Sequence, residues 1–190
     1  KPGGTSFNPL LIYGGVGLGK THLGHAIGVE IKDKYPDKTV LYISSEKFTQ
    51  QFIDSVKSNT RNDFIHFYQM IDVLIIDDVQ FLSGKAGTQD VFFHIFNHLH
   101  QAGKQIILTS DRYPKEIDGV EDRLKSRFGW GLNVPIEPPE LETRVAILKR
   151  KADQAAMNLP NEAAFFLSSS WVLSPRPMAS TAMAPMMMYS

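Results

Sequence analysis

The sequence predicts a three-layer α/β fold, in which helices flank a central parallel sheet. Short apolar runs recur along the chain, and helix-like segments separate each run from the next. Parallel neighbours need a long crossover connection, usually a helix, so this alternation is typical of a parallel sheet. A length of 190 residues and a hydrophobic content of 43% allow one domain with a sizeable core. The expected strands are residues 10–13, 40–44, 73–77, 105–110 and 132–136.

Periodicity and helix-ending residues place the helices between these strands. Leu23, Ile27 and Ile31 lie four apart, so we expect this face of the first crossover helix to pack on the sheet. Pro36 closes that helix. Two helical stretches precede the third strand, where a minimal crossover needs only one, so an insertion is predicted at about 46–70. The helices are expected at residues 46–58, 60–70, 88–101, 121–128 and 140–156.

Composition limits the classes of function. The 20 basic and 20 acidic side chains cancel, so any contact with DNA must be local rather than a general attraction to phosphate. The absence of cysteine excludes disulfides and thiolate metal sites. No run of about 18 apolar residues and no basic-then-apolar leader occurs, which predicts a soluble, cytoplasmic protein. We expect residues 1–167 to form the core and residues 168–190, rich in Ser, Pro, Ala and Met, to be a disordered tail.

A glycine-rich segment follows the first expected strand. Residues 14–21 read GGVGLGKT and fit the phosphate-loop pattern G-x-x-x-x-G-K-[ST]. In that loop the glycines allow backbone N–H groups to point at phosphates, Lys20 reaches the β and γ phosphates, and the Thr21 hydroxyl can ligate Mg²⁺. The strand before it and the helix after it provide the required context, which predicts a P-loop nucleoside triphosphatase fold.

Acidic side chains follow two other expected strands. Asp77 and Asp78 end an apolar run, and Asp111 comes directly after the next strand. The carboxyl ends of parallel strands are where ligands bind in open α/β sheets. We therefore assign Asp77 to Mg²⁺, Asp78 to the attacking water and Asp111 to sensing the γ phosphate. The alternative is that these are ordinary turn or cap aspartates.

Two arginines lie four apart in the expected helix at 121–128. Arg123 and Arg127 therefore share one face of that helix. A guanidinium there can complete the active site of a neighbouring subunit, because an arginine supplied in trans stabilises charge on the transferring phosphoryl group. A solvated helix with salt bridges has the same spacing, and this alternative stays open.

Taken together, these motifs resemble the AAA+ ATPase core of the DnaA family of bacterial chromosomal replication initiators. The resemblance covers nearly all residues before Ser168. It is carried by the phosphate loop and by further blocks at residues 8–10, 45–48, 74–78, 80–81, 109–117, 120–132 and 138–144. This combination is far more specific than a phosphate loop alone.

The resemblance implies a role for each candidate site residue. ATP or ADP would be bound by Asn8, Gly15, Gly17, Leu18, Gly19, Lys20 and Thr21. Mg²⁺ would be held by Thr21 and Asp77, while Asp78 assists hydrolysis and Asp111 acts as the first sensor. Arg127 would reach the ATP of a neighbouring subunit, and Arg123 would shape the same inter-subunit surface. Ile53 and Lys85 match positions that touch single-stranded DNA.

The resemblance also implies a function and a set of partners. It implies a weak ATPase used as a switch, which self-associates into a filament on single-stranded origin DNA and promotes unwinding. The replicative helicase, regulators and acidic phospholipids are further partners that the family implies. The C-terminal helical lid and its second sensor are expected to be largely missing, and no sequence-specific recognition of duplex DNA is expected from this stretch. The alternatives are a related AAA+ helicase loader or initiator regulator, or a nucleotide-independent adaptor.

Overall fold

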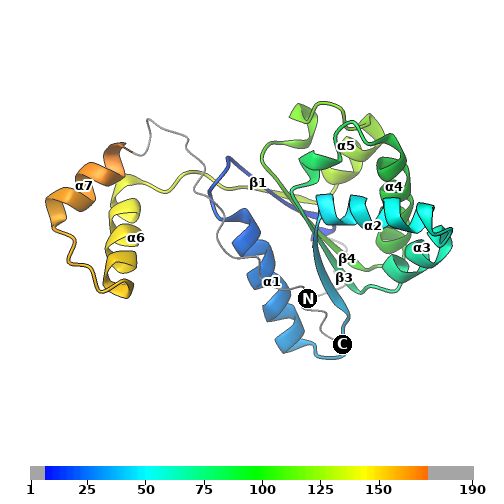
Figure 1. Ribbon diagram of the computed structural model, residues 1–190, viewed down its shortest axis with the longest axis horizontal. Helices are drawn as coiled ribbons and strands as arrows, with labels where there is room; N and C mark the ends of the chain where they lie inside the picture. The colour runs from blue at the N-terminus through cyan, green and yellow to red at the C-terminus, as the bar shows by residue number, and fades with distance from the viewer. Residues whose placement is uncertain (1–6, 171–190) are drawn as a thin grey trace. The chain divides into compact units, whose positions relative to one another are not determined.

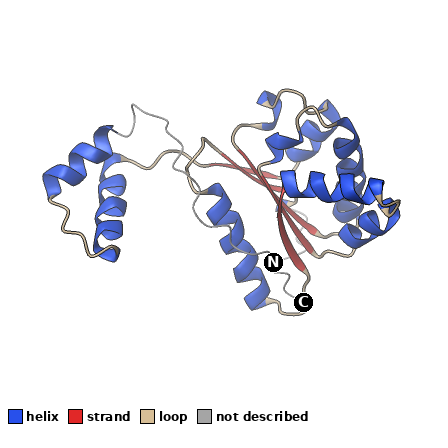
Figure 2. Cartoon of the chain, viewed as in Figure 1, coloured by secondary structure: helices blue, strands red, loops and turns tan. Residues whose placement is uncertain are grey.

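A five-stranded parallel sheet forms the centre of the computed structural model, which describes residues 7–170 (Figures 1 and 2). The strand order is β2-β3-β4-β1-β5, and every neighbouring pair is parallel. The predicted strands are confirmed, and only the fifth ends one residue earlier than expected. Their bounds are Leu10–Tyr13 for β1, Val40–Ser44 for β2, Val73–Asp77 for β3, Gln105–Ser110 for β4 and Leu132–Pro135 for β5.

Helices cover both faces of the sheet, as the sequence predicts. Figure 1 shows α1 on one side, whereas α2, α3, α4 and α5 lie on the other. Two helices, α2 and α3, follow one another between β2 and β3. The bounds are Lys20–Lys34 for α1, Ser45–Lys57 for α2, Arg61–Gln69 for α3, Ala86–Gln101 for α4 and Asp122–Phe128 for α5, with short 3-10 helices at Val79–Leu82 (η2) and Pro114–Glu116 (η3).

The face of α1 that meets the sheet differs in part from the predicted one. Ile27 and Ile31 pack against a cluster of sheet residues that includes Ile75, as expected. Leu23 is 39% exposed and lies outside that face. The buried positions of the helix instead include Gly24 and Gly28. Glycine has no side chain to hold the helix away, so α1 approaches the sheet closely along this line.

An aromatic cluster joins the inserted helices to the rest of the core. The ring of Phe48 in α2 lies 5.3 Å from Phe64 and 5.0 Å from Tyr68, both in α3, and 5.4 Å from Phe92 in α4. Offset and edge-on contacts at such distances are the favoured geometry for aromatic pairs. The Tyr68 hydroxyl is also satisfied, because it donates to Oε1 of Gln51 at 2.6 Å. The α2–α3 insertion is therefore packed as part of the core.

The described chain divides into two compact units, one up to Ile136 and one from Glu137 onward. The second unit contains α6 (Leu141–Gln154) and α7 (Asn161–Ser170), which pack against each other. The α6 helix lies within the helix expected at 140–156. The α7 helix is not predicted from the sequence, and it extends to Ser170, beyond the expected start of the tail at 168. The rest of the expected tail, residues 171–190, lies outside the described residues.

Within residues 7–170, no helix is both long enough and apolar enough to cross a lipid bilayer.

Candidate phosphate-binding site

The glycine-rich loop connects the end of β1 to the start of α1. Gly17 and Gly19 have φ values of 81° and 88°, a left-handed conformation that glycine adopts without strain. Lys20 is the first residue of α1 and is 6% exposed, and its Nζ donates to the Gly15 carbonyl at 2.8 Å. The first turn of α1 has neither an acidic side chain nor a side-chain cap. Its N–H groups are therefore available to an anion, as in other phosphate loops.

Asp77 lies at the end of β3 and is 4% exposed. Its Oδ2 accepts a hydrogen bond of 2.6 Å from the Tyr42 hydroxyl, and its Oδ1 accepts one from Oγ1 of Thr109. Thr109 is itself fully buried in β4. Burial, and then the hydrogen bond to Asp77, hold the pKa of Tyr42 above its ordinary value, so the hydroxyl remains a donor. Two neighbouring strands thus fix the orientation of the Asp77 carboxylate.

Asp78 has a backbone that is unusual for a residue other than glycine. Its φ of 56° and ψ of 58° are left-handed, a region that aspartate visits more readily than most residues. Two hydrogen bonds hold this conformation: the Asp78 N–H donates to Oγ1 of Thr109 at 2.8 Å, and Oγ of Ser45 donates to the Asp78 carbonyl at 2.6 Å. The carboxylate is consequently turned away from the direction that a regular strand would give it.

The electrostatic surroundings of Asp78 show which predicted residues lie together. Burial raises the pKa of Asp78 above its ordinary value, and the negative charges of Asp77 and Asp111 act in the same direction. The Gln80 amide and the positive charge of Lys20 oppose this effect without cancelling it. The structure therefore brings Lys20, Asp77, Asp78 and Asp111 to one place, at the carboxyl edge of the sheet.

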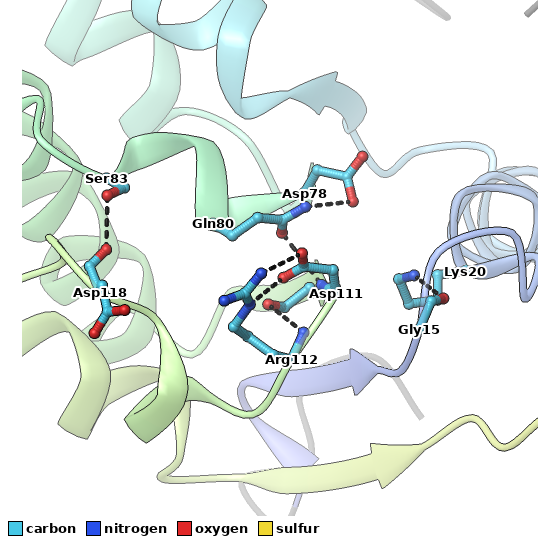
Figure 3. Close-up of polar contacts among 9 residues, drawn as sticks. Gly15, Lys20, Asp78, Gln80, Ser83, Asp111, Arg112 and Asp118 are labelled. Carbon is cyan, nitrogen blue, oxygen red and sulfur yellow. Dashed lines mark hydrogen bonds and ion pairs between the residues drawn. The ribbon is translucent and has the colours of Figure 1, made fainter. Parts of the chain in front are cut away.

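Gln80 links the ends of β3 and β4 (Figure 3). Its Nε2 donates to Oδ1 of Asp78 at 3.1 Å, and its Oε1 accepts the Asp111 N–H at 3.3 Å. The Asp111 carboxylate is held by Arg112, which donates to both carboxylate oxygens at 3.0 Å. Sequence reasoning did not assign a role to Gln80, Tyr42 or Thr109. They come from separate elements, so no local spacing relates them to the phosphate loop.

The two predicted inter-subunit arginines contact α4 rather than the phosphate loop. Arg123 pairs with Glu121 at 2.5 Å and with Asp90 of α4. The Nε of Arg127 donates to Oδ1 of Asn97, also in α4, at 2.9 Å. None of the polar contacts of either arginine within residues 7–170 involves residues 14–21.

The side chain of Asn8 bonds the backbone at the start of β4. Its Nδ2 donates to the Lys104 carbonyl at 2.6 Å and its Oδ1 accepts the Ile106 N–H at 2.9 Å. These backbone groups lie at the amino end of β4, whereas the phosphate loop lies at the carboxyl end of β1. The amide joins the start of β1 to β4, and the assignment of Asn8 to the cofactor stays a prediction.

The predicted DNA-contacting residues lie on the inserted helix and just before α4. Ile53 is in α2 and is 40% exposed, and Lys85 precedes the first residue of α4. A methyl group added at Gly87, near the start of α4, would lie 3.7 Å from the ring of Phe52. The start of α4 and the middle of α2 are therefore neighbours.

The residues present fit a nucleoside triphosphate with a divalent cation. The loop glycines leave open space, since a Cβ at Gly17 or Gly19 would meet nothing within 4 Å. Thr21 is exposed in the first turn of α1. Its hydroxyl and the Asp77 carboxylate are the hard oxygen ligands that Mg²⁺ prefers.

The family model for the bacterial DnaA ATPase domain matches residues 1–135. The chain belongs to the bacterial DnaA ATPase domain family. A chromosomal replication initiator protein DnaA from Flavobacterium psychrophilum is 71% identical over 162 residues, which are 85% of this chain and 34% of that protein. The chain thus spans about one third of the length of this DnaA relative.

Solved DnaA structures have the same architecture. Domain III of the Thermotoga maritima replication initiation protein DnaA is 47% identical and superposes with a TM-score of 0.81, covering 87% of this chain and 70% of that one. A replication initiator DnaA bound to AMPPCP and single-stranded DNA is 46% identical with a TM-score of 0.79, covering 87% of this chain and 51% of that one. The α/β fold with its parallel sheet, predicted from the sequence, is that of DnaA domain III.

Proposed function

We propose that this chain is the ATP-binding and slowly ATP-hydrolysing core of a chromosomal replication initiator. In this proposal, ATP-dependent self-assembly at the origin promotes DNA unwinding, and the ADP form is the reset state. One observation carries the proposal: a complete phosphate loop with a buried lysine faces two strand-end aspartates, in a chain of the DnaA family. The role places the protein in the cytoplasm, with the chromosome.

Each residue of the site has a chemical role in this proposal. The N–H groups of the loop and the Lys20 ammonium bind the phosphates, with Gly15, Gly17, Leu18 and Gly19 forming the backbone cradle. Thr21 and Asp77 would hold Mg²⁺, which when bound neutralises charge on the β and γ phosphates. Asp78 orients the attacking water and accepts its proton, for which a pKa raised above the ordinary aspartate value is suited. Asp111, held by Arg112 and adjacent to Gln80, reports on the γ phosphate.

The arginines of α5 would act on a second copy of the chain. We assign Arg127 to the nucleotide of the neighbouring subunit and Arg123 to the surface around it. Both arginines contact α4, and none of their polar contacts within residues 7–170 involves the chain's own phosphate loop, which supports an action in trans.

Single-stranded DNA would pass along the inserted helices, with Ile53 and Lys85 in contact. Support comes from the DnaA structure bound to AMPPCP and single-stranded DNA, and from the proximity of α2 and the start of α4. The replicative helicase, regulators of initiation and acidic phospholipids are further partners in this proposal. A helicase loader or a regulator is disfavoured because the matching family model describes the DnaA ATPase domain and the 71% identical relative is a chromosomal replication initiator. A nucleotide-independent adaptor is disfavoured by the buried lysine and the paired aspartates.

Sedimentation velocity with a single-stranded oligonucleotide tests the proposal. We expect assemblies larger than one chain with ATP and Mg²⁺, and monomers with ADP. Arg127→Ala should remove the ATP-dependent assemblies, whereas Arg150→Ala, which removes an exposed guanidinium from α6, should not. Equal assembly in ATP and ADP would contradict the proposed switch.

A further inference from the structure

The Arg127 side chain is held by contacts that leave its charge uncompensated. Its Nε donates to the neutral amide oxygen of Asn97 at 2.9 Å. The central guanidinium carbon lies 3.6 Å from the ring centroid of Trp130 and 5.5 Å from that of Phe93. Cation–π contacts fix the position of a guanidinium without supplying a negative charge. Within residues 7–170, no carboxylate forms an ion pair with Arg127.

The neighbouring arginines differ from Arg127 in this respect. Arg123 also lies over the Phe93 ring, at 4.8 Å, but its guanidinium binds two carboxylates, those of Glu121 and Asp90. Arg112 binds both oxygens of the Asp111 carboxylate. An anion approaching either of these side chains would have to displace a carboxylate. An anion approaching Arg127 would not, because only its Nε is engaged with a polar group of the described chain.

Trp130, whose ring lies beneath the Arg127 guanidinium, is itself packed against a side chain of α4. His100 of α4 lies edge-on to the Trp130 ring at 5.4 Å, and it stacks on the buried ring of Phe96 at 6.1 Å. Trp130 nevertheless remains 51% exposed, which is unusual for a large aromatic side chain in a packed position. One helix thus supplies both the amide that binds Arg127 and the histidine that packs against Trp130.

We propose that Asn97 and Trp130 are positioning residues, which hold Arg127 in a fixed place with its two terminal nitrogens free for a phosphate group carried by a second copy of this chain. This inference rests on the proposed function, in which Arg127 acts in trans. A bidentate guanidinium suits a phosphate group, provided that no resident carboxylate competes for it. The neutral amide of Asn97 meets that condition, because it fixes Nε without neutralising the charge.

The substitution Asn97→Asp tests this directly, because it keeps the shape of the side chain and adds the missing carboxylate. We expect ATP affinity and thermal unfolding to stay close to those of the wild type. The protein concentration needed for half-maximal ATP-dependent assembly should rise at least tenfold. His98→Asp is the matched control, since it adds the same charge at an exposed position of the same helix. Trp130→Leu, which removes the aromatic ring beneath the guanidinium, should weaken assembly in the same way. It replaces Asn97→Asp as the test if that variant does not fold.

A mixing experiment separates positioning of Arg127 from a general loss of structure. The Asn97→Asp variant binds ATP but presents a neutralised arginine, whereas Lys20→Ala has no nucleotide but presents a functional Arg127. Mixing the two should restore ATP-dependent hetero-association and hydrolysis, because the second variant supplies the arginine to the first. Mixing Asn97→Asp with Arg127→Ala should restore neither. Damage to the fold of Asn97→Asp would not be repaired by a partner in this selective way.

The outcomes distinguish a failure of this inference from a failure of the proposed function. If Arg127→Ala abolishes assembly while Asn97→Asp and Trp130→Leu assemble normally, the inference is wrong and the proposed function stands. If Lys20→Ala fails to restore a defective Asn97→Asp variant, the defect is not in the arginine and the inference is also wrong. If Arg127→Ala itself assembles normally with ATP, the trans role in the proposed function fails, and the inference fails with it.

Discussion

Tyr42 orients Asp77, one of the two side chains that we assign to Mg²⁺. Its hydroxyl donates to Oδ2 of Asp77 at 2.6 Å. Groups that orient a metal-binding carboxylate contribute to metal affinity even though they do not touch the ion. Tyr42 is therefore a supporting residue of the site, although β2 carries no recognisable nucleotide-binding motif.

Tyr42→Phe should weaken the binding of ATP with Mg²⁺ by about tenfold, the usual minimum effect of removing such a supporting hydrogen bond. The affinity for ATP in the presence of EDTA should stay unchanged, because the phosphate loop is intact. Calorimetric titrations with and without Mg²⁺ measure both, and Tyr35→Phe at the end of α1 is the control. An equal loss with and without Mg²⁺ would show that Tyr42 supports the fold and not the metal site.

Asp78 illustrates how a functional carboxylate reduces stability. Its folded-state pKa is raised, chiefly by burial, so the folded protein holds a proton there more readily than the unfolded chain. The stability that this provides is present at low pH and is lost as the pH rises through the raised pKa. At neutral pH the ionised Asp78 is therefore a cost to folding.

Asp78→Asn should remove this cost while keeping an acceptor for Gln80. We expect the Tm at pH 7 to rise by a few degrees, about 2–4 °C for each kcal/mol in a domain of this size, and the gain to shrink towards pH 4. ATP hydrolysis should fall by about 10²-fold or more, with ATP binding retained. Melting curves across this pH range test the idea, with Asp37→Asn as the exposed control. A Tm difference independent of pH would rule out the titration of Asp78 as its cause.

At the scale of elements, the close contact of α1 with the sheet positions the phosphate loop. A Cβ at Gly28 would lie 3.0 Å from Cδ1 of Ile75 in β3, whereas one at Gly24 would have ordinary contacts, the nearest at 3.6 Å. Lys20 begins the same helix, so a shift of α1 would move the lysine relative to the aspartates.

Gly28→Leu should force α1 away from the sheet and lower the free energy of unfolding by about 1–3 kcal/mol, as overpacked cores do. Nucleotide affinity should fall as well. Gly24→Ala is the matched control, and it should be neutral or slightly stabilising, because alanine favours a helix more than glycine does. Urea denaturation of both variants measures the difference. Equal stabilities would mean that Ile75 moves aside without cost.

The sequence predicted the elements well where one physical signal dominates. The buried run of β3 and the phosphate loop are both local patterns, and the structure places them as expected. The α7 helix was not predicted, because three apolar residues at 165–167 followed by three serines show no helical period. In the same way, the contacts of Gln80 with Asp78 and Asp111 depend on the strand order of the sheet. That order is set by tertiary packing, which local spacing does not encode.

At the scale of the whole molecule, both hydrophobic clusters lie in the first unit. The larger cluster and the α1-facing cluster consist entirely of residues up to Ile136. The second unit contributes α6, which has no buried residue, and α7. The stability of the first unit should therefore depend little on these two helices.

A fragment of residues 1–136 should fold on its own and unfold cooperatively. We expect its Tm to lie within about 4 °C of that of the whole chain, a difference of about 1–2 kcal/mol at this size. Circular dichroism during heating is a sufficient measurement. A broad, non-cooperative transition would show that α6 and α7 are needed for the fold of the sheet.

Residues 14–21, with the aspartates at the sheet edge, form the proposed ATP site. The most direct measurement is a calorimetric titration of the 190-residue chain with ATP and Mg²⁺, alongside Lys20→Ala. Lys32→Ala is the matched control, because this lysine lies near the other end of α1 and binds the Pro36 carbonyl instead. We predict micromolar or tighter binding for the wild type and Lys32→Ala, and a loss of at least 100-fold, about 2.7 kcal/mol, for Lys20→Ala. Equal affinity in the wild type and Lys20→Ala would show that the phosphate loop is not the ATP site.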